Sequence, residues 1–495
     1  MRSNESMKLK VNKISTVIAA LYACITLNVL WIALVLESRE TGYCVLSILT
    51  IVHFMIALLL IKSEGQKIIS VSGIFIVFLY VFHTGQLIVY SLFKNYKYAK
   101  TNYIEYTGKN LFFYSSIISI LVITMIVVGI IIGDKIFIKT QNSVWLGKKA
   151  TISNRKLKIV GWFIVLTTFP FHFKVAYNQI ILAMQGNYFD VFEYQISGIL
   201  YAYTQFFLIG VSLLMVAYAK KKWKLTSIYL TTVLYFCWTM LAGSRGRAVI
   251  AIVFFTLLYL KLIGITVIKL IPFVIVGYIG LIGLSIISVA RDSGGITLAV
   301  LMEGFKSAGS PILRILEEFG GTQYTVALSV REVPSNVSYQ GGSSYILSLM
   351  SVLPNIGGVL AEVNNRALFY SQYFQDYMGG SIIAELYTNF GYLFPVPAMI
   401  IGIFVGKLSN IFEKAIQKKV YVVIPFLALL INGIMWWVRD SVASIIRNPI
   451  WGYFYLVILF KIYDEIYRGK YNEKCVNNNW SVTDGGSRKN KSRFC

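Results

Sequence analysis

Residues 111–133 read LFFYSSIISILVITMIVVGIIIG, a run of 23 positions without a charged side chain. An α-helix rises about 1.5 Å per residue, so this run would reach about 35 Å and cross the roughly 30 Å hydrocarbon core of a bilayer. Eleven further apolar runs lie at 14–36, 43–62, 68–93, 157–175, 196–218, 226–242, 248–265, 268–290, 381–405, 420–438 and 449–463. The sequence therefore predicts an all-α polytopic membrane protein with about twelve transmembrane helices.

The composition agrees with this fold class. Of the 495 residues, 57% are hydrophobic and 14% are charged, and the mean hydropathy is +0.67. A soluble domain of this size could not hide so much apolar surface. The net charge of +24 does not indicate a nucleic-acid partner, because the basic residues fall mostly in short segments between apolar runs.

Lysine and arginine in the connections set the expected orientation, because cytoplasmic loops are enriched in them. With twelve spans, the basic segments that fall on one side are 1–13, 134–158, 220–224, 406–419 and the tail after 461. That side is assigned to the cytoplasm, so both termini are expected there. The segment 94–110 is the main exception, since its lysines Lys94, Lys97, Lys100 and Lys109 fall outside.

This topology divides the chain into four parts. We expect an N-terminal bundle of about nine transmembrane helices at 1–290, one large extracytoplasmic loop at 291–380, about three C-terminal helices at 381–463, and a basic cytoplasmic tail at 464–495. The loop has no apolar stretch long enough to cross and no Pro/Ser-rich low-complexity sequence. A folded cap on the membrane surface is therefore predicted rather than a linker.

Arginines gather at the outer boundary, where the charge rule predicts a deficit. They are Arg245, Arg247, Arg291, Arg439 and Arg447. Guanidinium groups suit phosphate oxygens, so this cluster indicates an anionic ligand outside the membrane. For any single arginine, snorkelling to the interface or binding a lipid headgroup explains the position equally well.

Helix-start residues accompany these arginines. Ser244 can cap the span after it, Ser381 can cap the next one after the loop, and Asn448-Pro449 is typical of an N-cap followed by proline in the first turn. Helix N-termini present free N–H groups and partial positive charge, which adds to the attraction for phosphate.

The stretch GGSIIAELYTNFG, residues 379–391, lies where the loop re-enters the membrane. Ser381, Glu385 and Asn389 recur every four residues, so they are expected on one helix face. A lone carboxylate in this apolar setting is a functional-site candidate, and the alternative is a structural salt bridge to an arginine.

Three histidines complete the candidates. His172 falls near the outer end of its span and could act as a base, whereas His53 and His83 lie mid-span, where hydrogen-bonded packing is expected. No spacing of residues resembles a zinc site, so neither a metal nor another cofactor is expected.

The sequence LAGSRGR at 241–247, the stretch 379–391 and the loop before the last three spans resemble the Wzy-type polymerases of O-antigen and capsular polysaccharide. The resemblance implies an inverting, metal-independent glycosyltransferase of the membrane-embedded GT-C type in the bacterial cytoplasmic membrane. Its substrates would be glycans linked to undecaprenyl diphosphate, joined outside the membrane. Membrane lipids, a flippase and a chain-length regulator are the partners that the family implies.

On this hypothesis each candidate residue receives a role. Arg245, Arg247, Arg439 and Arg447, with Arg291, would bind the leaving diphosphate, and Glu385 or His172 would orient or deprotonate the acceptor hydroxyl. Ser381 and Asn389 would contact the substrate at the start of the re-entering helix. Arg314, Arg331 and Arg366 of the loop would cover the glycan.

Three alternatives remain open. An O-antigen-ligase-like transferase would use the same donor with another acceptor, and the loop lacks the histidine expected of ligases. A flippase or other transporter could also have twelve spans, but repeat symmetry and midplane charges are not evident. A non-catalytic membrane scaffold is the third.

Overall fold

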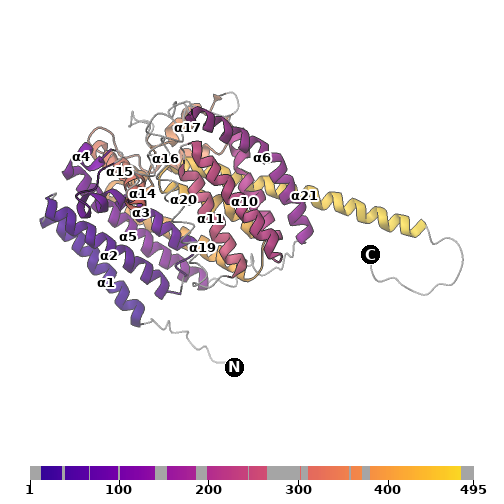
Figure 1. Ribbon diagram of the computed structural model, residues 1–495, viewed down its shortest axis with the longest axis horizontal. Helices are drawn as coiled ribbons and strands as arrows, with labels where there is room; N and C mark the ends of the chain where they lie inside the picture. The colour runs from indigo at the N-terminus through magenta and orange to yellow at the C-terminus, as the bar shows by residue number, and fades with distance from the viewer. Residues whose placement is uncertain are drawn as a thin grey trace.

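The computed structural model describes residues 13–35, 39–65, 67–98, 101–139, 153–184, 198–242, 245–264, 302, 310–355, 358–370 and 379–480. Within these residues the regular elements are all helices, which Figure 1 shows packed side by side. Ten of them are long and apolar enough to cross a bilayer. The predicted all-α polytopic membrane fold is therefore confirmed.

The N-terminal helices lie together at one end of the molecule, in indigo and purple in Figure 1. They are α1 (Lys13–Val35), α2 (Glu40–Ser63), α3 (Val71–Leu92), the short α4 (Tyr103–Thr107) and α5 (Lys109–Lys139). The hydroxyl of Tyr43 donates to the carbonyl of Lys109 at 2.6 Å. This bond joins the start of α2 to the start of α5.

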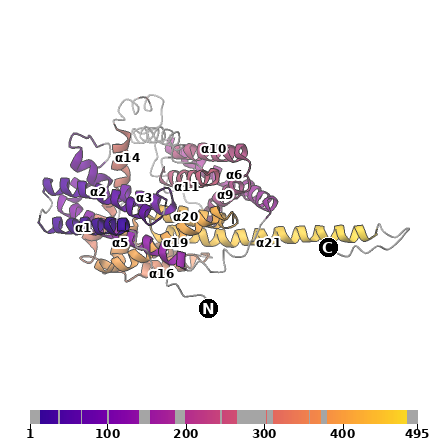
Figure 2. The same cartoon turned by 90° about the horizontal axis from the view of Figure 1, so that it is seen from below.

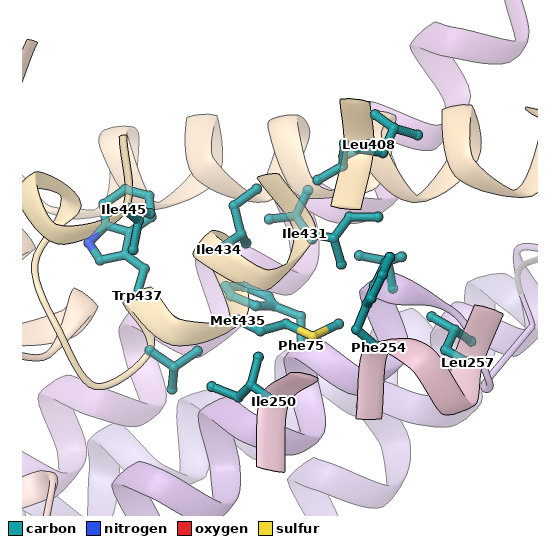
Figure 3. Packing of buried hydrophobic residues seen from close by; sticks show 14 of the residues in the cluster. Phe75, Ile250, Phe254, Leu257, Leu408, Ile431, Ile434, Met435, Trp437 and Ile445 are labelled. Atoms are coloured by element: carbon teal, nitrogen blue, oxygen red, sulfur yellow. The ribbon is translucent and has the colours of Figure 1, made fainter. Parts of the chain in front are cut away.

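The remaining long helices pack beside this group. They are α6 (Asn154–Met184), α8 (Gly198–Gln205), α9 (Phe207–Ala217), α10 (Lys222–Thr239) with the 3₁₀ turn η1 (Met240–Ala242), α11 (Arg245–Ile263), α19 (Pro395–Gln417), α20 (Val423–Trp437) and α21 (Val442–Trp480). One buried apolar cluster joins the two groups and includes Phe75 of α3, Phe254 of α11 and Leu408 of α19 (Figure 3). Figure 2 shows α21 extending well beyond the other helices.

Most expected apolar runs coincide with candidate spans. The eight runs from 14–36 to 248–265, in chain order, each match one, whereas the run 268–290 lies outside the described residues. The run 420–438 forms α20, which has only 15 residues, and the run 449–463 lies inside α21.

The expected span 381–405 is wrong. This stretch forms α18 (Ile382–Phe390), the 3₁₀ turn η4 (Gly391–Leu393) and the beginning of α19. Gly391 has a φ of +53°, and a Cβ there would lie 2.6 Å from the ring of Tyr339, so the break requires glycine. Pro395 then starts α19, where proline is tolerated. The span is therefore α19, which also contains most of the expected connection 406–419.

Helices α5 and α19 approach each other through glycines. A Cβ on Gly402 would overlap the carbonyl oxygen of Ile126, and one on Gly129 would overlap that of Met399. Both helices run in the same direction, because Asn410, further along α19, donates to Asp134, further along α5. The close contact lets two backbones pack where lipid offers no hydrophobic driving force.

The large loop contributes helices to the bundle. They are α14 (Pro311–Gly320), α15 (Gln323–Glu332), α16 (Ser343–Met350) and α17 (Ala361–Ala367). Gly85 of α3 and Gly320 of α14 leave no room for a Cβ at their crossing. Gln323 of α15 donates to Ser115 at 3.0 Å and accepts from Ser119 at 2.7 Å, both in the span of α5. Thus α14 and α15 pack into the bundle, whereas the sequence predicts a cap on the membrane surface.

Charged side chains pair at both ends of the bundle. Lys156, in the first turn of α6, binds Asp464 of α21 at 2.7 Å. At the opposite end, Lys94 binds Glu40 at 3.1 Å and Lys109 binds Glu105 at 3.4 Å. Two of the four lysines that depart from the charge rule are thus neutralised by neighbouring carboxylates.

Replacing Gly402 tests the contact of α5 with α19. The variant Gly402→Val is expected to lose about 1–3 kcal/mol of stability, because the new side chain must push the helices apart. The melting temperature of the purified protein in detergent measures the effect. Ile400→Val on the same helix is the control, since Ile400 is 58% exposed. Equal melting temperatures for both variants would contradict the prediction.

Candidate functional site

Residues 438–441 connect α20 to α21, and the segment 379–381 crosses them. A Cβ on Gly380 would come 2.7 Å from the carbonyl carbon of Asp440, and one on Gly379 would come 3.0 Å from the carbonyl oxygen of Arg439. Larger residues would force the two segments apart. The glycines therefore bring the start of α18 next to the start of α21.

The indole of Trp436, in the last turn of α20, lies against two guanidinium groups. The guanidinium carbon of Arg247 is 5.1 Å from the ring centre, and that of Arg439 is 5.4 Å from it. A Cβ on Gly246 would lie 2.7 Å from the indole, so the start of α11 also touches this ring. Cation–π attraction of about 0.5–2 kcal/mol each helps to keep both charges here.

Each of these arginines has a second aromatic neighbour. Arg247 lies 5.2 Å from the ring of Tyr201 in α8, and Arg439 lies 5.8 Å from the ring of Phe82 in α3. Among the described residues, no carboxylate is within ion-pair distance of either arginine. Aromatic rings therefore hold the two cations, and Asp440 acts on Arg247 from beyond ion-pair distance.

A cavity of about 180 Å³ opens beside Arg247, between α6, α8, α11, α20 and α21. The side chain of Arg247 is exposed in this cavity. The other polar lining residues are His172, Gln179, Tyr201, Thr204, Gln205, Thr239, Asn432, Ser444 and Asn448. Neutral amides and hydroxyls around one guanidinium suit a ligand that carries hydroxyl groups and an anionic group.

Asp440 is the carboxylate next to the two arginines. It is buried and interacts electrostatically with Arg247. Its oxygens accept from the backbone N–H of Ser441 at 2.7 Å, from Ser444 at 2.8 Å, from Tyr370 at 3.0 Å, and from the indole N–H of Trp436. Four donors therefore satisfy this buried charge.

Glu385 is fully buried at the start of α18. Its carboxylate accepts from the indole N–H of Trp437 at 2.6 Å, from the backbone N–H of Val442 at 3.1 Å and from Ser344 at 3.4 Å. These bonds tie α18 to α16 and to both helices that flank the 438–441 connection. The partners of Glu385 are thus neutral donors, and no ion pair with a described arginine is present.

The predicted helix face of α18 is confirmed. Ser381 caps the helix by accepting from the backbone N–H groups of Ile383 and Ala384, at 3.2 and 3.3 Å. The hydroxyl of Ser344 contacts both Glu385 and Asn389, because it donates to the carboxylate of Glu385 and accepts from the amide of Asn389 at 2.8 Å. His83 lies 2.8 Å from the Ser381 hydroxyl, which agrees with the hydrogen-bonded packing expected of that histidine.

The model of the family described as O-antigen polysaccharide polymerase Wzy matches residues 17–468. The chain belongs to the Wzy family. The predicted resemblance is therefore confirmed, and the family makes this chain a polysaccharide polymerase of the bacterial inner membrane with lipid-linked oligosaccharides as substrates. No curated protein and no solved structure matches the chain.

In this Wzy polymerase the predicted boundary arginines do not form one cluster. Arg247 and Arg439 share Trp436. Arg447 instead donates to the carbonyl of Ser351 at 2.8 and 2.5 Å and to Asn364 at 3.2 Å, so it ties α21 to the loop. Arg291, Ser244 and the side chain of Arg245, which begins α11, lie outside the described residues.

The three loop arginines lie apart from one another. Arg314 is in α14, where it interacts electrostatically with Tyr96. Arg331 donates to Glu332 at 2.7 Å, and hydrogen bonds from Asn336 and Arg331 hold the pKa of Glu332 below its usual value. Arg366 and Glu362 form an exposed pair at 3.8 Å.

The two predicted catalytic candidates occupy different surroundings. His172 lines the cavity, and its Nδ1 lies 2.5 Å from the hydroxyl of Tyr235. Glu385 is not among the residues that line the cavity. Of the two, His172 is the one that faces space for a ligand.

The expected helix start at Asn448-Pro449 is wrong. Helix α21 begins at Val442, and Pro449 lies inside it. The 438–441 connection ends earlier than the apolar run suggests, because Val442 is already held by Glu385. Asn448 is instead one of the residues that line the cavity.

Sequence reasoning missed Trp436 and Asp440. Both belong to the stretch Trp436-Trp437-Val438-Arg439-Asp440-Ser441, which joins two apolar runs. The available signal was a carboxylate directly after an arginine at the predicted outer boundary. The net charge of the segment does not reveal such a pair, because the opposite charges of Arg439 and Asp440 cancel.

The variant Glu385→Ala tests the tie between α18 and α21. Removing the carboxyl group leaves the buried N–H donors of Trp437 and Val442 without their acceptor, at a cost of about 1–3 kcal/mol each. Thermal unfolding in detergent measures this loss. Glu362→Ala is the control, since its side chain is 84% exposed. An unchanged melting temperature for Glu385→Ala would refute the structural tie.

Proposed function

We propose that this Wzy polymerase joins undecaprenyl-diphosphate-linked repeat units on the outer face of the cytoplasmic membrane, and that Arg247 and Arg439 bind the leaving diphosphate. The observation that carries the proposal is the pair of guanidinium groups on Trp436, of which that of Arg247 lines a cavity with neutral polar groups. We also propose that the loop at 291–380, which connects the N-terminal bundle at 1–290 to the helices at 381–463, faces the outside, and that both termini lie in the cytoplasm.

The charge of the site supports a diphosphate ligand. Two cations without a carboxylate partner within ion-pair distance attract an anion, and a planar guanidinium can bind two phosphate oxygens at once. Charge grows on the bridging oxygen as the sugar bond breaks, so donors aimed at it lower the barrier. Arg245, Arg291 and Arg447 are proposed as further contacts of the lipid-linked substrate.

The cavity supports a sugar beside the diphosphate. Gln205 and Asn432 offer amides that both donate and accept hydrogen bonds, and Tyr201 adds an aromatic surface. In the proposed step the acceptor hydroxyl oxygen attacks the anomeric carbon of the donor, the carbon–oxygen bond to the diphosphate breaks, and the diphosphate leaves with the electron pair. The anomeric centre is inverted.

His172 is the proposed acceptor of the hydroxyl proton. Its ring lines the cavity, and contact with Tyr235 orients it. Glu385, Ser381 and Asn389 are proposed to hold the α18 face in place behind the site. The loop arginines Arg314, Arg331 and Arg366 are proposed to contact the glycan.

Arginine substitution tests the diphosphate site. Arg247→Gln and Arg439→Gln are each expected to lower the polymerisation rate about 100-fold, the loss typical of one donor to a developing charge. Purified protein with a synthetic lipid-linked repeat unit measures the rate. The control is Lys94→Gln, which removes an exposed cation from the same end of the bundle. A full rate in both arginine variants would exclude the proposed role.

Glycan length in cells distinguishes the alternatives. With Arg247→Gln, a polymerase is expected to leave surface glycans of a single repeat unit, because export and attachment continue without polymerisation. Gel separation of the surface polysaccharide shows the length. Loss of all surface glycan would instead indicate a ligase or a flippase.

Chelation tests the proposed independence from metals. Guanidinium groups supply the charge in this mechanism, so EDTA is expected to leave the initial rate unchanged. The assay with purified protein and a lipid-linked repeat unit measures it. A rate that falls with EDTA and returns with added Mg²⁺ or Mn²⁺ would show that a divalent ion takes part.

A further inference from the structure

Asp440 and Trp436 form a connected unit one helical turn apart. The indole N–H of Trp436 donates to one carboxylate oxygen of Asp440, while Ser441, Ser444 and Tyr370 donate to the other. The carboxylate is therefore fixed from two sides. Only 6% of Asp440 is exposed, so the residue itself has little surface to offer a ligand.

The position of the indole decides where two charges lie. Arg247 and Arg439 come from different helices, and both contact the Trp436 ring. Rotation of the ring would remove the surface against which both groups pack. It is also limited by Gly246, which the indole touches on its other edge.

We infer that Asp440 is a positioning residue, which holds the Trp436 indole so that Arg247 and Arg439 face a shared phosphate ligand. The inference rests on the proposed function, because it assigns those arginines to the leaving diphosphate. Asp440 acts through Trp436 and makes no contact with substrate.

A different role for Asp440 predicts the opposite effect. As a counter-charge to Arg247, the carboxylate would oppose a phosphate, so its neutralisation would strengthen anion binding. As a positioning residue, its neutralisation weakens binding because the indole is released. The sign of the change separates the two roles.

Asp440→Asn is a selective test. Asparagine keeps an oxygen for Ser441, Ser444 and Tyr370 but places an NH₂ group against the indole N–H. The Kd of undecaprenyl diphosphate for the full-length protein in nanodiscs is expected to rise roughly tenfold, the loss typical of one hydrogen bond to a charged group. An unchanged or lower Kd overturns the inference.

A double-variant cycle tests the route through Trp436. Trp436→Phe removes the indole N–H, so Asp440→Asn is expected to add less than about twofold in that background. The same tenfold loss in both backgrounds overturns the inference. Tyr370→Phe is the matched control, since it removes a donor to the other carboxylate oxygen and is expected to change the Kd less than about twofold.

The arginine variants separate this inference from the proposed function. If Arg247→Gln and Arg439→Gln weaken binding but Asp440→Asn does not, the positioning role fails alone. If the arginine variants bind as tightly as the natural sequence, the proposed function fails and the inference with it. If Asp440→Asn does not yield folded protein, Trp436→Phe carries the test, and an unchanged Kd in that variant overturns the inference.

Discussion

Gly380 lies so close to the backbone of Asp440 that a methyl group would approach its carbonyl carbon to 2.7 Å. This crossing joins the chain that leaves the large loop to the connection between α20 and α21. Glu385 can then reach the backbone of Val442 and the indole of Trp437. The site depends on the same crossing, because it fixes the segment that carries Arg439 and Asp440. Two adjacent glycines thus allow parts distant in sequence to share one framework.

The sequence predicted the spans well because apolar length is a local property. A run such as 111–133 must cross the hydrocarbon layer, whether lipid or other helices surround it. The break at Gly391 was also encoded locally, by the glycine and by Pro395, but continuous hydrophobicity concealed it. The insertion of α15 into the bundle could not be predicted, since it depends on Gln323 meeting serines of α5, about 200 residues away in the sequence.

The sequence predicted which kinds of residue form the candidate site, but not which of those residues lie close together. Charge in an unexpected place singled out Arg247 and Arg439 together with Arg447. Which of them lie together depends on how α11 meets α20, and that contact is set by Gly246 against an indole. Arg447 satisfies loop carbonyls instead. Trp436 was missed because an aromatic residue near a membrane boundary is common and carries no distinctive pattern.

The shortness of α20 has a consequence for the depth of the site. Its 15 residues rise about 22 Å, roughly 8 Å less than the hydrocarbon thickness of a typical bilayer. A helix that starts at the inner boundary would therefore end beneath the outer headgroups, and Trp436 with its two cations would sit in a recess below the lipid surface. A headgroup entering that recess must shed bulk water, which strengthens its attraction to the guanidinium groups. Such a recess would also exclude water molecules that could replace the sugar hydroxyl as the attacking group.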